Sequence, residues 1–74
     1  MKESRFRLDF TANDLMKYYH GQATQVVATT DAGYSIQFPA RALRAYVDKQ
    51  GAVKGYFRIL YTDDNKFVRI DKIV

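Results

Sequence analysis

A strict alternation of apolar and polar side chains constrains the fold of this chain more than any other feature. Between Ser4 and Phe10, the apolar residues Phe6, Leu8 and Phe10 alternate with charged ones, and a second alternating run spans residues 53–61. Successive side chains of a strand point to opposite faces, so each run predicts a strand with one buried and one solvated face. The chain must therefore build a sheet with one apolar side.

Two hairpins complete the predicted sheet. A turn at residues 31–33 separates a segment rich in Val and Thr from the alternating residues Tyr34, Ile36 and Phe38, which is typical of a β-hairpin. The polar residues 63–65 form a second turn after the second alternating run. The predicted strands are residues 4–10, 25–30, 34–38, 53–61 and 67–74.

A short helix is predicted between the first strand and the first hairpin. The Thr11 hydroxyl can accept a hydrogen bond from an unpaired N–H at the helix start, and Asp14 suits the first turn. Gly21 can adopt the left-handed conformation that ends a helix. The helix is therefore expected over about residues 12–20. Its predicted buried stripe is Leu15, Tyr18 and Tyr19.

The segment Gln37–Arg44 predicts a strand that runs directly into a second short helix. Pro39 ends the strand and suits the first helical position, because its φ is fixed and it lacks an N–H. Gly51 is expected to close this helix. Its predicted buried stripe consists of Ala40, Leu43, Tyr46 and Val47.

These elements predict an α+β domain with the order β-α-β-β-α-β-β. A small, mostly antiparallel sheet would carry both short helices on one face, and residues 1–74 would form a single domain. The chain has no cysteine, so neither a disulfide nor a thiolate metal site can hold the fold together. Its six Tyr and five Phe must therefore supply much of the buried area of a small core.

No segment of the sequence is suited to a membrane. Residues 1–10 alternate and contain no apolar signal region, and no apolar run approaches the ~18–20 residues of a membrane span. Together with the absence of cysteine, this predicts a cytoplasmic protein with no membrane partner. The formal net charge of +4 is compatible with nucleic acid or an acidic protein as the partner.

The residue inventory gives little basis for catalysis. The one histidine, His20, stands at the predicted end of a helix, where its positive form suits the dipole, so we interpret it as structural. Asp63, Asp64 and Asn65 lack the spacing of a calcium loop and fit a plain turn. No phosphate loop or nucleophile motif is present. We therefore expect a protein that is not an enzyme and has no cofactor, metal or small-molecule substrate.

Arg41 and Arg44 are the first candidate binding residues. Their i, i+3 spacing puts both on one side of the predicted second helix, away from its buried stripe. Two guanidinium groups near the free N–H groups of a helix start could bind a phosphate. The alternative is a solvated helix face on which Arg44 pairs with Asp48 one turn later.

The solvated face of the sheet is the second candidate. If the terminal strands pair, basic and aromatic side chains share this face, which is the composition of a single-stranded nucleic-acid platform. The residues concerned are Arg5, Arg7, Lys54, Tyr56, Arg58, and Phe67 or Arg69. The alternatives are a solvated face of alternating charge, or a surface where Tyr56 and Leu60 pack under a helix or a second subunit.

Several segments, taken in order, resemble one protein family. They are Tyr18-Tyr19-His20-Gly21, the segment Ile36–Val47 with its Gln-Phe-Pro-Ala-x-x-Leu-Arg pattern, Gly51, Val53, Gly55 and Phe57, and Asp64-Asn65-Lys66-Phe67. Over nearly its whole length the chain resembles DUF2835, a family of short proteobacterial proteins catalogued as a domain of unknown function. The resemblance implies a bacterial cytoplasmic protein, and it implies no activity and no binding residues.

Two hypotheses of function remain. The leading one is a binding module that contacts nucleic acid, mainly its phosphates, through Arg5, Arg7, Arg41, Arg44, Lys54, Tyr56, Arg58 and Arg69. The alternative is a protein-interaction or homodimerisation module that uses Tyr56, Leu60 and an exposed sheet edge. One patch that unites Arg41 and Arg44 with the sheet arginines would favour the first hypothesis, and separate surfaces would favour the second.

Overall fold

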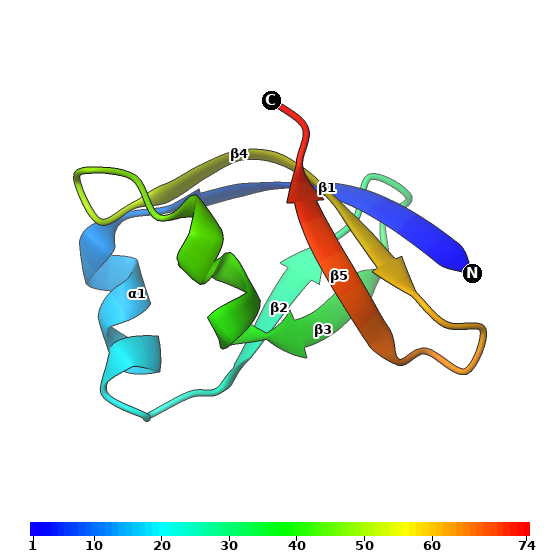
Figure 1. The fold of residues 1–74 in the computed structure, drawn as a ribbon, viewed down its shortest axis with the longest axis horizontal. Coiled ribbons are helices and arrows are strands. Elements are labelled where there is room, and N and C mark those ends of the chain that lie inside the picture. Colours follow the sequence, from blue (N-terminus) through cyan, green and yellow to red (C-terminus); the bar gives the residue numbers. More distant parts are fainter.

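The computed structural model of the protein describes residues 1–74 and contains five strands, one α-helix and one 3-10 helix (Figure 1). This content confirms the predicted α+β class and the predicted order of elements. In chain order the elements are β1 (Lys2–Phe10), α1 (Ala12–Tyr19), β2 (Gln25–Thr29), β3 (Ser35–Pro39), η1 (Ala40–Tyr46), β4 (Val53–Tyr61) and β5 (Phe67–Lys72).

The strands divide into two antiparallel sheets. One sheet has the order β1-β4-β5, and the other is the hairpin of β2 and β3. In the first sheet, Phe6 of β1 lies opposite Phe57 of β4. One backbone hydrogen bond ties the hairpin to β1: the N–H of Asp31 donates to the carbonyl of Arg5 at 2.9 Å. The hairpins follow from local patterns, whereas this division depends on how the hairpins dock on β1.

An aromatic core fills the space between the two sheets. Phe6, Phe38 and Phe57 are buried, and the ring centroid of Phe6 lies 5.7 Å from that of Phe38 and 6.2 Å from that of Phe57. Tyr46 of η1 packs edge-on against Phe57 at 5.5 Å. Full burial of one such ring stabilises the fold by roughly 1.5–3 kcal/mol. These rings therefore dominate a core of only eleven buried residues.

The start of α1 is held by the capping residues that the sequence predicts. The Thr11 hydroxyl accepts a hydrogen bond from the N–H of Asp14 at 3.1 Å, and the Asp14 carboxylate accepts one from the N–H of Thr11 at 2.9 Å. That backbone N–H of Thr11 holds the pKa of Asp14 below its ordinary value. Of the predicted stripe, Leu15 is buried but Tyr19 is 57% exposed. The helix therefore presents an aromatic side chain to the surface.

The second helix, η1, is a 3-10 helix whose core-facing residues include Ala40, Leu43 and Tyr46. With three residues per turn, Ala40, Leu43 and Tyr46 fall in one row along the helix. Leu43 is buried, and the Tyr46 hydroxyl donates to the carbonyl of Ile70 on β5 at 2.8 Å. This row joins η1 to the three-stranded sheet.

The structure corrects both predicted ends of the second helix. Pro39 is the last residue of β3 and precedes the helix, rather than being its first helical residue. Val47 is already extended, with φ −71° and ψ 126°. Gly51 therefore belongs to a separate turn, in which its N–H donates to the carbonyl of Asp48 at 3.0 Å. Val47 still packs against the core, but it does so with an extended backbone outside the helix.

Candidate interaction surfaces

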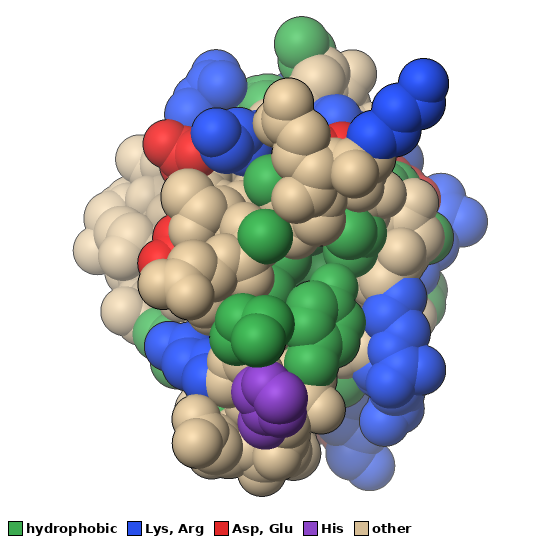
Figure 2. Space-filling view, turned by 90° about the vertical axis from the view of Figure 1, so that its left-hand side faces the viewer, with side chains coloured by type: hydrophobic (Ala, Val, Ile, Leu, Met, Phe, Trp, Pro, Cys, Tyr) green, Lys and Arg blue, Asp and Glu red, His purple; other side chains and the backbone are tan.

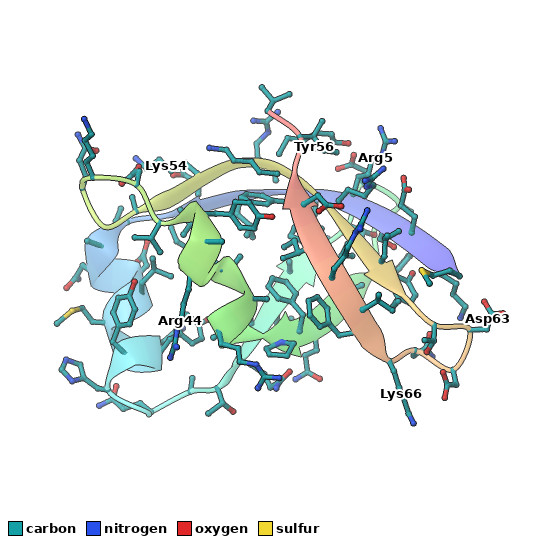
Figure 3. The ribbon with its side chains drawn as sticks, in the orientation of Figure 1. Arg5, Arg44, Lys54, Tyr56, Asp63 and Lys66 are labelled. Carbon is teal, nitrogen blue, oxygen red and sulfur yellow. The ribbon has the colours of Figure 1, made fainter.

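The solvated face of the β1-β4-β5 sheet, called the outer face below, collects most of the predicted basic and aromatic residues. The strand register places Arg5 opposite Arg58 and Arg7 opposite Tyr56. In Figure 3, Arg5, Lys54 and Tyr56 lie along the side of this sheet that is turned away from η1. The predicted residues that share the outer face are Arg5, Arg7, Lys54, Tyr56, Arg58 and Arg69.

Carboxylates of the same face pair with most of these cations. Arg58 lies 3.0 Å from Asp71 and 3.8 Å from Glu3, and Arg69 lies 3.2 Å from Asp71. The hydrogen bond from Arg58 holds the pKa of the Asp71 carboxyl below its ordinary value. Arg5 lies 3.1 Å from Glu3, and Lys54 lies 3.8 Å from Asp9. These cations are therefore engaged within the protein.

Arg7 is the one predicted cation of the outer face that forms no ion pair, and it lies against Tyr56. The Arg7 guanidinium lies 5.5 Å from the centroid of the Tyr56 ring, within cation–π distance. The Tyr56 hydroxyl donates a hydrogen bond to the Asp31 carboxylate, and this bond raises the pKa of Tyr56. The Tyr56 ring, which was predicted to stack on bases, therefore already contacts Arg7, and its hydroxyl is hydrogen-bonded to Asp31.

Arg41 and Arg44 both lie on η1, and Figure 3 shows Arg44 on the other side of the sheet from the outer face. Neither forms an ion pair. The carboxylate of Asp48, the expected partner of Arg44, instead accepts two backbone N–H groups of its own turn, both at 2.9 Å. The N–H of Ala40 at the helix start donates to the carbonyl of Thr24 at 2.9 Å. The eight predicted residues therefore divide between two surfaces.

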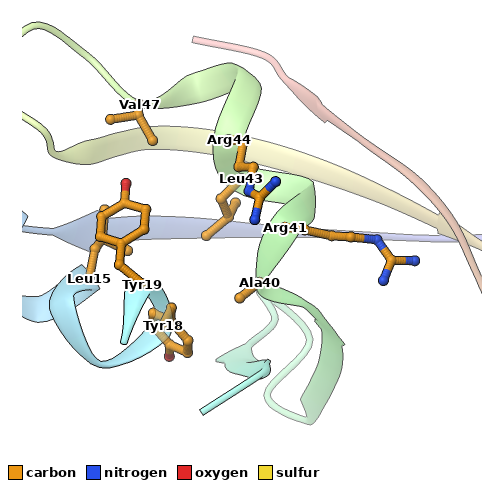
Figure 4. Close-up of a pocket in the computed structure, with 8 residues that line it drawn as sticks. All are labelled: Leu15, Tyr18, Tyr19, Ala40, Arg41, Leu43, Arg44 and Val47. Carbon is orange, nitrogen blue, oxygen red and sulfur yellow. The ribbon is translucent and has the colours of Figure 1, made fainter. Parts of the chain in front are cut away.

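A shallow groove of about 50 Å³ lies between α1 and η1 (Figure 4). In Figure 4 the Arg44 guanidinium lies beside Leu43 at the groove, whereas the Arg41 side chain points away from α1. Pockets for small molecules usually measure roughly 300–1,000 Å³, so this groove can accept only the end of one side chain. Its lining residues are Leu15, Tyr18, Tyr19, Ala40, Arg41, Leu43, Arg44 and Val47.

A larger cleft, of about 420 Å³, lies between β3 and the β4–β5 hairpin. The sequence reasoning anticipated an exposed sheet edge but not this cleft, because its walls come from strands that are distant in the sequence. Phe67, the other candidate on β5, does not join the outer face, since its ring lies 6.4 Å from that of Phe38. The lining residues are Tyr34, Ser35, Ile36, Gln37, Ile59, Tyr61, Asn65 and Phe67.

Three hydroxyl groups meet beside this cleft. The Ser4 hydroxyl oxygen lies 2.9 Å from that of Tyr34 and 2.8 Å from that of Tyr61. Ser4 is buried, and its hydrogen bond lowers the pKa of Tyr34. The cleft therefore combines apolar walls with a small number of fixed polar groups.

The β3 side of the cleft is a free sheet edge. The N–H of Thr30 donates to the carbonyl of Tyr34 at 2.8 Å, so these two residues form a hydrogen-bonded pair. In the register of β2 and β3, every second pair from there on is also hydrogen-bonded, namely Ala28 with Ile36 and Val26 with Phe38. Antiparallel pairing alternates, so the backbone groups of Ser35 and Gln37 are directed away from β2. No other strand pairs with this edge of β3.

The remaining candidates form no site. His20 follows α1 as its cap, and its N–H donates to the carbonyl of Met16 at 3.0 Å. No three His, Cys, Asp or Glu side chains are grouped so that they could hold a metal ion. Neither helix has both the length and the apolar character that crossing a membrane requires.

The protein is therefore a small α+β domain with two antiparallel sheets around an aromatic core. Its surface carries the groove between α1 and η1 and the cleft beside β3. The family model described as protein of unknown function, DUF2835, matches residues 2–73. The chain therefore belongs to this family. No curated protein and no solved structure is significantly similar to it.

Proposed function

We propose that this protein is a non-enzymatic protein-interaction module that binds an extended segment of a partner along the free edge of β3. The observation that carries the proposal is a pair of residues, Ser35 and Gln37, whose unpaired backbone groups border a cleft of about 420 Å³. Such an edge can accept a further strand, because the added backbone satisfies the free N–H and C=O groups.

The walls of the cleft favour a segment with alternating apolar residues. Side chains of a strand added beside β3 point alternately to its two faces, and one of these faces is that of Ile36. Ile36, Ile59 and Phe67 line the cleft and offer apolar contacts on this side. On the opposite face, Ser35 and Gln37 are exposed, so the side chains of the added strand on that face would stay in contact with solvent.

The distribution of charge favours a protein over nucleic acid as the partner. Arg41 and Arg44 do not extend the outer face, and all but one of the outer-face cations already pair with carboxylates. A phosphate backbone would have to displace these carboxylates or tolerate their repulsion. Affinity for nucleic acid depends on neutralising phosphates with free cations, so the outer face is poorly prepared for that task.

Selection from a random peptide library tests the proposal. We expect phage that bind the wild-type protein to display segments with apolar residues at every second position. Gln37→Pro removes a backbone N–H that forms no bond to β2, so the variant should keep its fold while its edge is blocked. A labelled peptide from the selection should bind this variant at least about tenfold more weakly, because hydrogen bonds and close approach are both lost.

Val27→Pro is the matched control for this experiment. Val27 lies directly opposite Gln37 in the hairpin, so its N–H is also directed out of the β2–β3 pair, but on the other edge. Peptide affinity of the Val27→Pro variant should equal that of the wild type. Peptides that bind the Gln37→Pro variant as tightly as the wild type would contradict the proposal, and so would a selection that enriches no peptide.

Nucleic-acid binding by the outer face is the second candidate function. It is favoured by one observation, namely that Arg7 has no carboxylate partner and lies against the Tyr56 ring. A labelled oligo-dT strand is the appropriate probe at low salt. Affinity that falls steeply with salt and is lost in Arg7→Glu would support this candidate over the first.

A further inference from the structure

We propose a second interaction surface at the groove between α1 and η1, which binds an acidic segment of a partner protein through one apolar anchor side chain. This surface is separate from the free edge of β3 and goes beyond the function proposed above. Its walls come from two helices that are distant in the sequence, and Arg44 lies at the groove (Figure 4).

The α1 wall of the groove belongs to a helix with two exposed apolar side chains, of which Tyr19 lines the groove and Met16 does not. Met16 and Tyr19 are 46% and 57% exposed, and their i, i+3 spacing puts them in one ridge of α1. Figure 2 views the molecule from the α1 end and shows hydrophobic side chains gathered next to the single histidine, His20. A cluster of exposed apolar side chains on a short surface helix is typical of a contact site.

The two charged side chains that line the groove are both positive. Arg41 and Arg44 line the groove without an ion pair, and no carboxylate is among its lining residues. Lys17 of α1 also lacks a carboxylate partner and lies 5.2 Å from the centroid of the Tyr18 ring. The outer face differs, because carboxylates pair with Arg5, Arg58 and Arg69 there. Charge complementarity therefore selects an acidic partner at the groove.

The two acidic residues nearest in sequence to the groove are engaged elsewhere. The Asp14 carboxylate caps the start of α1, and the Asp48 carboxylate accepts two N–H groups of its own turn. Neither forms an ion pair with Arg41 or Arg44. These two guanidinium groups are therefore left for an external carboxylate.

The size of the groove determines how the partner is held. A volume of about 50 Å³ admits the end of one aliphatic or aromatic side chain and excludes a cofactor-sized molecule. Six of its eight lining residues are hydrophobic, so the inserted group must be apolar. At many protein interfaces, a few anchor side chains that fill small pockets contribute most of the binding energy. The partner therefore needs one apolar residue flanked by Asp or Glu.

Two-dimensional NMR titration with a synthetic peptide tests this surface. The probe is a glutamate-rich peptide with one central leucine, and the reference probe carries serine in place of that leucine. We expect the leucine peptide to shift the amide signals of Leu15, Tyr19 and Leu43 and the serine peptide to bind several-fold more weakly. Equal affinity of the two peptides would overturn the proposal, because it would mean attraction by charge alone.

Charge reversal identifies the arginine that contributes. Arg44→Glu replaces attraction by repulsion and should weaken binding of the leucine peptide about tenfold. Lys66→Glu makes the same change of charge in the β4–β5 turn, far from the groove in Figure 3, and should leave the affinity unchanged. An equal loss in both variants would overturn the proposal.

Removal of the apolar wall provides an independent readout. Tyr19→Ala deletes an exposed ring, so the fold should persist while the leucine peptide loses several-fold in affinity. Unchanged affinity in Tyr19→Ala would count against the groove as the binding site. An oligo-dT strand that competes with the leucine peptide for the same amide signals would show instead that the surface recognises polyanions in general, which would also overturn the proposal.

Discussion

Gly55 determines how closely the C-terminal residues can approach β4. Its φ is 149°, and a Cβ at this position would lie 2.6 Å from the carbonyl oxygen of Val74 and 2.8 Å from Cε of Lys72. The missing side chain allows the N–H of Tyr56 to donate to the carbonyl of Val74 at 3.1 Å. Gly55 therefore allows the C-terminal residues to continue along β4 beyond the end of β5.

We expect Gly55→Ala to lower the free energy of unfolding by about 1–3 kcal/mol, because it adds both strain and a steric overlap. Chemical denaturation measures the loss, and amide exchange at Ile73 should accelerate as the C-terminal residues detach from β4. Gly33→Ala is the control, since Gly33 also has a positive φ of 91° but no atom within 4 Å of the added Cβ. Equal losses in both variants would show that the close approach at Gly55 contributes nothing.

Asp48 ties stability to pH through the turn that follows η1. Its carboxylate accepts the N–H of Ala52, which holds the pKa of Asp48 below the ordinary value of 3.8. A carboxyl whose pKa is lower in the folded state stabilises the fold above its unfolded-state pKa, and this contribution is lost as pH falls through the lower folded-state value.

We therefore expect the Asp48→Ala variant to be less stable than the wild type at neutral pH. The difference in the free energy of unfolding should shrink as the pH falls below 3.8, the ordinary pKa of an Asp carboxyl. Chemical denaturation of both proteins at neutral and acidic pH measures this change. A difference that stays constant with pH would mean that the charge of Asp48 does not stabilise the turn.

At the scale of elements, a single hydrogen bond supports the contact between η1 and β5. The Tyr46 hydroxyl donates to the carbonyl of Ile70, and the Tyr46 ring also packs against Phe57. Tyr46→Phe keeps the ring and leaves the Ile70 carbonyl without its partner, so it should cost roughly 1–2 kcal/mol in the free energy of unfolding. Tyr18→Phe, which also removes one hydroxyl from a half-buried tyrosine, should cost much less. Similar losses would argue against this bond as the link between the two elements.

The free edge of β3 has a direct signature in hydrogen exchange. Ile36 and Phe38 pair with β2 through their backbone groups, whereas the amides of Ser35 and Gln37 are directed away from it. We expect the first pair of amides to be protected and the second pair to exchange rapidly in NMR measurements. Protection of Gln37 in the free protein would show that the edge is closed and would remove the basis of the proposed function.

At the scale of the whole molecule, the free edge of β3 and the α1–η1 groove are expected to bind independently. No residue lines both the cleft and the groove. Gln37→Pro should therefore weaken only the library-selected peptide, and Arg44→Glu only the glutamate-rich peptide. Titration of each peptide against both variants measures the four affinities. A loss of both affinities in either variant would mean that the two surfaces are coupled or that the variant is unfolded, and the denaturation midpoint separates these cases.

Much of the fold could be predicted because its determinants lie close together in the sequence. The alternation of residues 4–10, the turn at residues 31–33 and the capping pair Thr11 and Asp14 each act through neighbours a few positions away. The 3-10 geometry of η1 was missed, since its period of three differs only slightly from that of an α-helix over seven residues. Its last residue, Tyr46, donates to the carbonyl of Ile70 on β5, a contact that no local pattern indicates.

The sequence by itself determined which residues form strands, where α1 begins, and that Arg41 and Arg44 have no place in the core. Only the tertiary structure decided that Arg5 lies beside Glu3 and Arg58 beside Asp71, while Arg44 lies at an apolar groove. The physical reason is that local patterns depend on backbone geometry over a few residues. Ion pairs, grooves and free edges depend instead on which strands meet, and that is set by the packing of the aromatic core.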